Sequence, residues 1–333
     1  MEMTWVKVSV VMGVYNGEPF VGEAIESILN QTYTDFEFIV IDDGSTDSTW
    51  DTIQSYASRD KRVKAVKNES NIGLTRSLNK GIAMAGGEYI ARQDADDISM
   101  PERFARQVEY LDRHPDTAVV GTIVEVIDGE GKHRRKMDLS ISAESVRIEL
   151  KERNPMVHGS VMMRKFDFEN AGGYREFFRY TQDLDLWLRL SEKRNIANLP
   201  DRLYKLRQGG GSISVEKGVH QDIFRDLALE LADRRKKYGK DRLSNMSAFE
   251  ANSFVEHYLE MSDLRKKRLK QKKYLLWTQL QLSRGGTSDA MRLLWKAIKT
   301  DPFHSSWMKI IMVNFIWVRM RNFLSTIKRL TGY

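Results

Sequence analysis

The chain has 333 residues, 41% of them hydrophobic and 10% aromatic, which is enough to bury one substantial core and a smaller appendage. The absence of cysteine excludes disulfides, thiolate nucleophiles and cysteine-ligated zinc sites, and leaves oxygen or imidazole as metal ligands. The formal net charge of +7 is concentrated late in the chain, which favours an anionic partner for that part.

Residues 1–14 carry one basic residue and then alternate in the manner of a strand. They lack the charged start and apolar run of a secretory signal, so we expect a cytoplasmic protein. The stretch Trp307–Val318 is apolar but contains Lys309 and Asn314, and it is too short to span a bilayer comfortably.

The first half of the chain alternates between apolar runs rich in β-branched residues and stretches with helical periodicity. The expected strands cover residues 8–14, 38–41, 63–66, 89–93 and 119–126, and the expected helices cover residues 20–29, 47–57, 74–85 and 103–113. This alternation predicts an α/β fold with a mostly parallel sheet covered by helices. Ligands bind such a sheet where its strands end.

Two acidic turns follow two of these strands. Asp42-Asp43-Gly44-Ser45 follows the strand at 38–41, and Asp94-Ala95-Asp96-Asp97 follows the strand at 89–93. Carboxylates this close repel one another, so they need either a cation or a solvated turn. The two turns together suggest a metal and a nucleotide, and a solvated turn before a capped helix is the alternative at Asp94–Asp97.

From Asn154 onward the pattern is mixed. We expect a strand-like run at His158–Met163, a helix at Asp183–Leu190, and a short run at Leu203–Leu206 that ends in a glycine-rich loop. After about Val215 nearly everything has helical periodicity. Residues 275–298 suggest a helical hairpin, for which a plain helical bundle is the simpler interpretation.

Several short motifs occur in a fixed order along the chain. They are Val8–Tyr15, Asn16-Gly17, Asp42–Asp47, Asn71-Ile72-Gly73-Leu74, Asp94–Asp97, Gly172-Gly173-Tyr174, Gln182–Trp187 and Leu203–Ser214. Each motif alone is common, but their ordered occurrence over roughly the first 215 residues resembles the family 2 glycosyltransferases of the GT-A fold.

The resemblance implies a GT-A type Rossmann-like sheet flanked by helices and followed by a helical extension. On this basis residues 1–215 are the expected catalytic domain, with the nucleotide-sugar half at about 1–125 and the acceptor half at about 126–215. Residues 216–302 are the expected helical extension, and residues 303–333 the expected basic amphipathic helix.

The resemblance also assigns a donor site. Asp96, together with Asp94, would hold a Mg²⁺ or Mn²⁺ ion that bridges the diphosphate of a nucleotide sugar, in an all-oxygen site that suits either metal. Asp42 or Asp43 would accept hydrogen bonds from the base or ribose, although Asp-Gly is also a common turn. The remaining expected donor-binding residues are Val14, Tyr15, Asn16, Gly73, Arg76, Ala95 and Arg207.

The expected catalytic base is Asp183, which matches the second position of the family's Glu-Asp motif. Gln182 stands where the family usually has Glu, so the tuning of the base is in doubt. A helix N-cap is the alternative role for Asp183. His158, Gln182 and Asp185 are acceptor-side candidates, although a lone histidine is more often a hydrogen-bonded core residue and Asp185 has a structural alternative.

Arg207 precedes the glycine-rich loop, and we expect it to clamp the diphosphate, with a solvated loop arginine as the alternative. In the tail, aromatic and basic side chains suggest docking on an anionic membrane surface, which would place the chain peripherally at the cytoplasmic face. Packing on the catalytic domain or on a partner is the competing interpretation. No nucleic-acid recognition module accompanies the basic residues.

These patterns predict a metal-dependent, inverting glycosyltransferase with a UDP- or dTDP-sugar donor and a saccharide or lipid-linked acceptor. The processive members' Gln-x-x-Arg-Trp motif is absent from the sequence, which favours a non-processive enzyme. A catalytically inactive nucleotide-sugar-binding protein in glycan assembly is the alternative that Gln182 leaves open. A nucleotidyltransferase or dinucleotide-dependent oxidoreductase would carry a different glycine-rich loop after the first strand.

Overall fold

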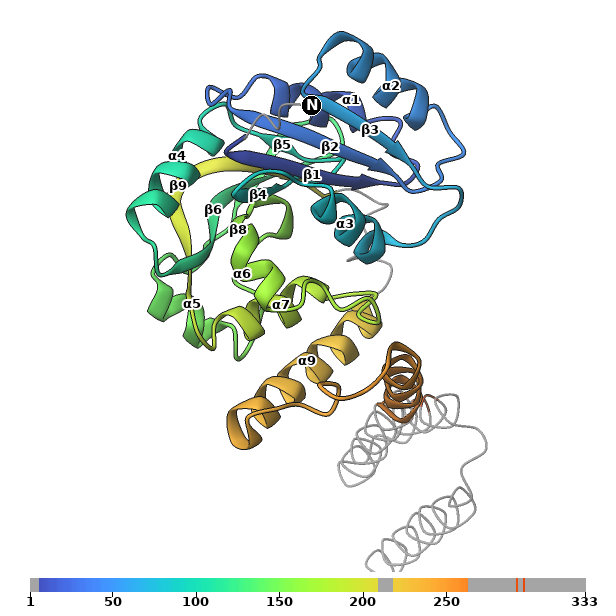
Figure 1. The fold of residues 1–333 in the computed structure, drawn as a ribbon, viewed down its shortest axis with the longest axis vertical. Helices are drawn as coiled ribbons and strands as arrows, with labels where there is room; N and C mark the ends of the chain where they lie inside the picture. Colours follow the sequence, from blue (N-terminus) through green and yellow to red (C-terminus); the bar gives the residue numbers. More distant parts are fainter. Residues whose placement is uncertain (1–5, 209–217, 263–291, 293–295, 297–333) are drawn as a thin grey trace, which may run out of the picture. The chain divides into compact units, whose positions relative to one another are not determined.

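The computed structural model describes residues 6–208, 218–262, 292 and 296, and it is drawn in Figure 1. The chain divides into two compact units, residues 1–247 and residues 248–333. In the second unit the described stretch 248–262 is helical. The expected hairpin at 275–298 and the expected helix at 303–333 lie outside the described residues, apart from two isolated positions, and the proposed domain boundaries stay predictions.

In the described residues, nine strands of the first unit form one mixed sheet, in the order β3-β2-β1-β4-β8-β6-β9-β5 with β7 beside β6. The strands are β1 Val8–Val14, β2 Phe36–Asp42, β3 Val63–Lys67, β4 Tyr89–Arg92, β5 Ile98–Ser99, β6 Thr117–Ile127, β7 His133–Lys136, β8 Met162–Arg164 and β9 Asn195–Arg207. Strands β1 to β4 pair in parallel, whereas β8 is antiparallel to both β4 and β6. The acidic turn after β4 therefore lies where the parallel half of the sheet meets its antiparallel part.

Helices cover both faces of the sheet. They are α1 Val21–Leu29, α2 Thr49–Arg59, α3 Leu74–Ala83, α4 Arg103–Arg113, α5 Ala143–Glu149, α6 Lys165–Asn170 and α7 Gln182–Leu190, with a 3-10 turn, η1, at His158–Ser160. Helix α9, Gly218–Tyr238, packs on α7. No helix in the described part of the chain is both long and apolar enough to cross a membrane.

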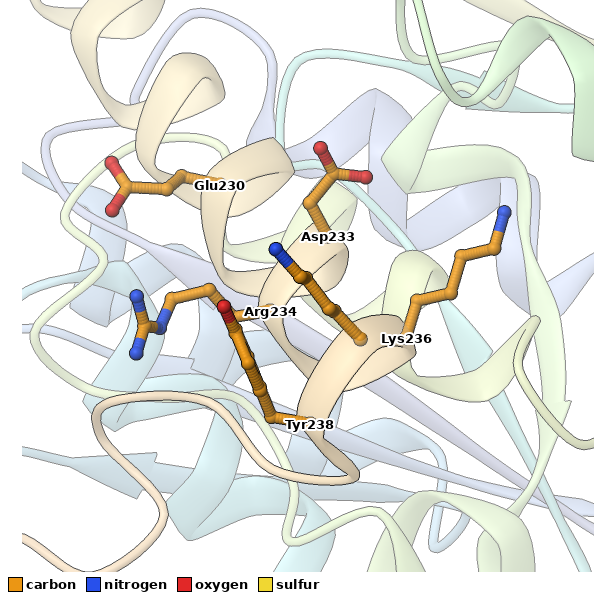
Figure 2. Close-up of a pocket in the computed structure, with 6 residues that line it drawn as sticks. Glu230, Asp233, Arg234, Lys236 and Tyr238 are labelled. Atoms are coloured by element: carbon orange, nitrogen blue, oxygen red, sulfur yellow. The ribbon is translucent and has the colours of Figure 1, made fainter.

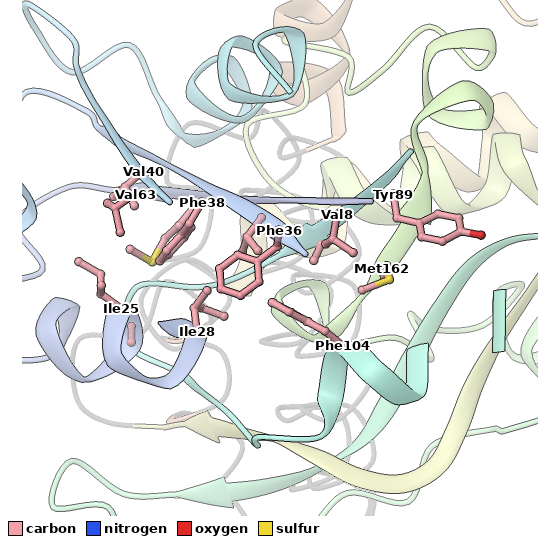
Figure 3. Close-up of a cluster of buried hydrophobic side chains, with 14 of the residues drawn as sticks. Val8, Ile25, Ile28, Phe36, Phe38, Val40, Val63, Tyr89, Phe104 and Met162 are labelled. Carbon is pink, nitrogen blue, oxygen red and sulfur yellow. The ribbon is translucent and has the colours of Figure 1, made fainter. Parts of the chain in front are cut away.

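Strands β1 and β2 are buried on both faces, which is why they read as continuous apolar runs. Alternate residues of these strands pack against α1, α2 and α4 in the cluster drawn in Figure 3, which includes Val8, Ile25, Phe38 and Phe104. On the opposite face, α3 approaches so closely that a Cβ on its Gly81 would lie 2.7 Å from Val11. This close packing fixes the positions of the strand ends.

The α/β fold class predicted from the sequence is confirmed, and each element expected in the first half of the chain is present within a few residues. The expected strand at His158–Met163 is wrong in its first part. Residues 158–160 form η1, in which the Ser160 amide donates to the Val157 carbonyl, and β8 begins only at Met162. A turn of three residues leaves no periodic pattern that would distinguish it from the start of a strand.

The expected run at Leu203–Leu206 is part of the longer strand β9. Its first half was missed because Asn198, Pro200 and Asp201 break the apolar alternation. The pairing of β9 with β6 shifts register between Leu199 and Arg202, so the interruption is accommodated by an irregularity in the sheet.

Candidate active site

The turns after β1 and β2 are joined by hydrogen bonds. The Asp43 amide donates to the Val14 carbonyl at 2.8 Å, and the Asn16 amide donates to Ser45 Oγ at 2.9 Å. Asn16 has a φ of 51° and accepts from the Thr46 amide through Oδ1. Tyr15 stays exposed beside this turn, so an open surface lies at the end of β1.

Asp42 and Asp43 are both buried but have different partners. The Asp43 carboxylate accepts from Asn68 Nδ2 and from the amides of Ile72 and Gly73, at 2.8 to 3.0 Å. Asp42 accepts from the Ser45 amide through Oδ1, whereas its Oδ2 has no hydrogen bond among the described residues. Asp43 therefore shapes the segment before α3, whereas the ion-pair partner of Asp42 Oδ2 is Lys67 Nζ, at 4.0 Å.

Gly73 precedes α3 with a φ of 92°, a conformation that glycine adopts without strain. Arg76, in the first turn of α3, pairs with Glu176 at 3.1 Å, and both side chains are about half exposed. Asn79 exchanges two hydrogen bonds with the backbone of Tyr174. Helix α3 thus connects the turn after β3 to the loop before α7.

Asp94 is held through its carboxylate by Arg92 of β4 and through its amide by Tyr204 of β9. Arg92, whose side chain is fully buried, donates to Asp94 Oδ1 at 2.7 Å, and the Asp94 amide donates to Tyr204 Oη of β9. Gly159 of η1 lies so close that a Cβ there would fall 2.7 Å from Asp94 Oδ2 and 2.0 Å from Tyr204 Oη. Glycine at position 159 is therefore what allows η1 to pack against this turn.

Asp96 reaches solvent, but the protein around it removes part of its hydration. This burial, together with the charge of Asp94, raises the pKa of Asp96 to about 6. Burial and the charges of Asp94 and Asp96 also raise the pKa of Asp97. Its Oδ2 has no hydrogen bond among the described residues. Ala95, between the two carboxylates, is partly buried.

The chemistry of this turn fits a hard divalent cation. The negative charge of Asp94 raises the pKa of Asp96, and a cation bound by both carboxylates would lower that pKa. Across the described residues, no group of three or more His, Cys, Asp or Glu side chains is arranged to hold a metal. Mg²⁺ is commonly bound by one or two carboxylates completed by phosphates and water.

Asp183 lies in the first turn of α7, and Asn154 Nδ2 donates to its Oδ2 at 2.6 Å. The N-cap position belongs to Thr181, which has a left-handed φ of 56°, so the N-cap alternative for Asp183 is wrong. Gln182 is buried beside it.

His158 lies in η1, next to Gly159, which packs against Asp94, and its ring meets Trp187 of α7 edge-on. His158 Nε2 lies 2.8 Å from Tyr174 Oη. Burial and Arg92 lower the pKa of His158, and the charges of Asp183 and Asp94 oppose them. Burial raises the pKa of the Tyr174 hydroxyl, and the charges of the same two carboxylates raise it further. Asp94 and Asp183, from distant parts of the sequence, therefore lie within electrostatic reach of the same two side chains.

Two candidates are engaged elsewhere. Asp185 is fully buried and pairs with Arg189 Nε at 3.0 Å and more distantly with Arg175. Arg207 is 5% exposed, and its guanidinium donates to the Asp96 carbonyl and to other protein acceptors. In this arrangement Asp185 has the surroundings of a structural residue, and Arg207 is not a solvated loop arginine.

The pocket drawn in Figure 2 lies elsewhere in the first unit. Its volume is about 570 Å³, and the lining residues Glu230, Asp233, Arg234, Lys236, Lys237 and Tyr238 all come from α9. None of the side chains discussed above lines this pocket. The candidate site at the strand ends is therefore a separate place in the fold.

The chain is similar in sequence to known glycosyltransferases. The model of glycosyl transferase family 2 matches residues 9–172. EpsE of Bacillus subtilis (strain 168), named as a glycosyltransferase, is 40% identical over 206 residues that cover 61% of this chain and 73% of EpsE. The chain belongs to glycosyl transferase family 2. The amylovoran biosynthesis glycosyltransferase AmsE of Erwinia amylovora is 32% identical over 213 residues, 63% of this chain and 79% of AmsE.

Solved structures share the family 2 fold. S. aureus TarS 1-349 in complex with UDP superposes with a TM-score of 0.52 at 16% identity, and the match covers 90% of this chain and 93% of that one. The mannosyltransferase PcManGT from Pyrobaculum calidifontis, in complex with GDP-Man and Mn²⁺, gives 0.51 at 17% identity, with 98% and 88% covered. At these identities the likeness establishes the fold alone.

Sequence reasoning missed several residues that surround the candidate site. Arg92 was detectable as a charge that ends an apolar strand run, and Tyr174 belongs to a motif that had been noted without a role. Asn154 and Tyr204 gave no signal, because neither occurs in a pattern that distinguishes it from ordinary polar or strand residues. Their contacts with Asp183 and Asp94 depend on the fold.

Proposed function

We propose that this family 2 glycosyltransferase is metal-dependent, inverting and non-processive. It moves a sugar from a UDP- or dTDP-sugar to a saccharide or lipid-linked acceptor. The observation that carries the proposal is the packing of η1 between Asp94 and α7, the helix that carries Asp183. A Cβ at Gly159 would lie 2.7 Å from Asp94 Oδ2, and the His158 ring lies 6.3 Å from that of Trp187 in α7. A donor site and a base must share one cavity for direct transfer between two substrates.

Asp94 and Asp96 would hold Mn²⁺ or Mg²⁺, together with the diphosphate oxygens and water. When bound, the ion neutralises charge on the departing nucleoside diphosphate. The chain's own contribution is to hold the two carboxylates at the edge of the sheet. Arg92 fixes Asp94 Oδ1, and the packing of Gly159 keeps η1 against the turn.

Asp183 is the proposed base. Its Oδ2 accepts from Asn154, which orients the carboxylate and leaves Oδ1 to take the proton of an acceptor hydroxyl. The acceptor oxygen then bonds to the anomeric carbon as the bond to the diphosphate oxygen breaks on the opposite face, which inverts that carbon. Gln182 is buried and carries no charge, so tuning by a neighbouring carboxylate at position 182 is absent.

The nucleoside would lie over the ends of β1 and β2. Asp42 is the carboxylate we assign to the base or ribose, because the Asp43 carboxylate is occupied by protein donors. Val14, Tyr15 and Asn16 would flank the base, and Gly73 and Arg76 would line the approach from α3. The UDP complex of TarS supports this choice of nucleotide, and the GDP-Man complex of PcManGT keeps a guanosine donor as the competing outcome.

The acceptor belongs to a growing glycan in this proposal. The relative AmsE is named for amylovoran biosynthesis, which supports a role in polysaccharide assembly. The basic residues late in the sequence support peripheral attachment to an anionic, cytoplasmic membrane face, where lipid-linked acceptors are found.

A thermal-shift series tests the proposal. UDP-, dTDP- and GDP-sugars are added with Mn²⁺ or with a chelator to the wild type, Asp96→Ala and Asp183→Asn. We expect a metal-dependent rise in melting temperature with one class of donor, its loss in Asp96→Ala, and its retention in Asp183→Asn. Asp183→Asn should then lower turnover by about 10² to 10⁴. Stabilisation that ignores both the metal and Asp96→Ala would count against the proposed site.

A further inference from the structure

The side chain of Arg207 joins three segments that are distant in the sequence. Its Nε donates to the Asp96 carbonyl at 2.8 Å, and Nη1 donates to the carbonyls of Asp128 and Gly129 at 3.1 Å. Its Nη2 forms an ion pair with Glu23 of α1. The segments are the acidic turn, the β6–β7 turn and helix α1.

The backbone of Arg207 is attached to the same acidic turn. Its amide donates to Asp97 Oδ1 at 2.7 Å, and the guanidinium carbon lies 4.4 Å from the centre of the Phe20 ring. Only 4% of the Arg207 side chain is exposed, whereas 52% of the Glu23 side chain is. Arg207 therefore binds two groups of the acidic turn, the main-chain carbonyl of Asp96 and the side-chain carboxylate of Asp97.

These bonds commit the guanidinium. Arginine has five N–H donors, and the contacts to Asp96, Asp128, Gly129 and Glu23 occupy four of them. To reach a diphosphate, the buried Arg207 side chain would have to break these four hydrogen bonds, which is unfavourable. The contacts favour a role in holding the turn over direct contact with the donor.

We propose that Arg207 and Glu23 are positioning residues for Asp96. Arg207 holds the peptide of Asp96 in place, and Glu23 holds the guanidinium of Arg207, so the Asp96 carboxylate is presented to the cation in one orientation. This inference rests on the proposed metal-dependent function. Partners of this kind, one step removed from a metal ligand, commonly contribute 10-fold to 100-fold, roughly, to metal affinity.

Glu23 can be substituted without changing any residue that is proposed to contact the donor or the acceptor. The variant is Glu23→Ala, and the matched control is Glu26→Ala, which removes another α1 carboxylate whose recorded partner is Tyr56 Oη. Glu23→Gln is a milder version that keeps an acceptor but removes the charge. All are made in the full chain, and circular dichroism and melting curves establish that each variant is folded.

The first measurement needs no metal. Hydrogen–deuterium exchange of a peptide covering residues 94–99 should be about tenfold faster in Glu23→Ala, because a charge-assisted bond behind the turn is lost. Exchange should be unchanged in Glu26→Ala and intermediate in Glu23→Gln. Equal exchange in Glu23→Ala and the wild type would overturn the positioning role.

The second measurement is the affinity for UDP by calorimetry, with Mn²⁺ and with a chelator. We expect Glu23→Ala to weaken UDP binding about tenfold in Mn²⁺ and to leave binding in the chelator unchanged. If Arg207 instead binds the diphosphate, freeing it in Glu23→Ala should preserve or strengthen UDP binding, and Arg207→Ala should weaken it even in the chelator.

The wild-type result distinguishes failure of the positioning inference from failure of the proposed function. If its UDP affinity is metal-dependent and Glu23→Ala behaves identically, the positioning inference fails and the proposed function stands. If the wild type binds UDP equally well with and without Mn²⁺, the proposed metal dependence fails and the inference falls with it.

Discussion

Asp42 and Asp43 show why adjacent residues of one type need not share a role. Sequence reasoning left the choice between them open. Asp43 is saturated by Asn68, Ile72 and Gly73, whereas Asp42 Oδ2 has no hydrogen bond among the described residues and lies 4.0 Å from Lys67 Nζ. A buried acceptor with only a distant cation is costly, and a donor on the base or ribose would relieve that cost, which is why Asp42 is the proposed partner.

Gly159 provides a test at the level of a single atom. In Gly159→Ala the new Cβ would fall 2.0 Å from Tyr204 Oη and 2.7 Å from Asp94 Oδ2, so η1 or the acidic turn must move. We expect kcat/KM to fall by about tenfold to a hundredfold, since small displacements of positioned groups carry losses of that order. Steady-state kinetics with the preferred donor measures it.

The control for this change is Gly129→Ala, because a Cβ at Gly129 meets no atom within 4 Å. Its kinetics should match the wild type. Unchanged kcat/KM in a folded Gly159→Ala variant would show that the close packing of η1 on Asp94 has no part in transfer.

At this scale the sequence predicted residue types better than their contacts. Asp94, Asp96 and Asp183 are candidates from the sequence because their motifs specify them. Glu23 gave no signal, since an exposed glutamate on a helix is ordinary, and its importance here follows from its ion pair with Arg207.

Among the elements, α7 is held by a buried network of ion pairs. Asp185 of α7 pairs with Arg189 and Arg175, and Arg175 Nη2 donates to Asp241 Oδ2 at 2.8 Å. Asp241 also accepts from Arg235 of α9 at 2.7 Å. The helix that carries Asp183 is thereby connected to the segment after α9.

This network predicts a loss of stability in acid. Burial alone would raise the pKa of Asp241, but Arg175 and Arg235 outweigh it and lower that pKa from 3.8 to about 2. A lowered pKa stabilises the folded state above pH 4, and that stabilisation disappears as the pH falls towards 2. The shift corresponds to about 2 kcal/mol of unfolding free energy.

Urea unfolding between pH 7 and pH 2 measures this dependence. Asp241→Asn should be less stable than the wild type at pH 7 by about 2 kcal/mol, and the two should converge near pH 2. Parallel curves for the two proteins over the whole range would mean that Asp241 does not contribute through its charge.

The predictability of the elements follows their environment. Strands β1, β2 and β4 were recovered because strands buried on both faces have uninterrupted apolar sequences. Strands β5 and β7 were missed, one because it has two residues and the other because its four residues are all exposed and its pattern is His-Arg-Arg-Lys. Only pairing with neighbours defines such strands.

For the first unit as a whole, the candidate site lies at the change from parallel to antiparallel pairing. β4 is parallel to β1 on one side and antiparallel to β8 on the other. Asp94 follows β4 and η1 precedes β8, so the pairing change brings the two together. Open α/β sheets commonly bind ligands where their strand order changes.

At the scale of the full chain, the tail provides a test of localisation. Deletion of the residues after Asp301 removes Trp307, Lys309, Arg319 and Arg321, so it should release the protein from anionic vesicles. Sedimentation with phosphatidylserine-containing vesicles measures binding, and neutral vesicles are the control. Unchanged partitioning after the deletion would reject membrane docking by this segment.

The bonds that Asp43 makes to Asn68, Ile72 and Gly73 would affect how the proposed nucleotide is captured. They fix the segment before α3 during folding, so its conformational entropy is lost before any ligand arrives. A nucleoside entering beside it would meet a preorganised wall and would not bear that ordering cost. Fast, rigid docking of the base is then expected, and slower steps would belong to other parts of the chain.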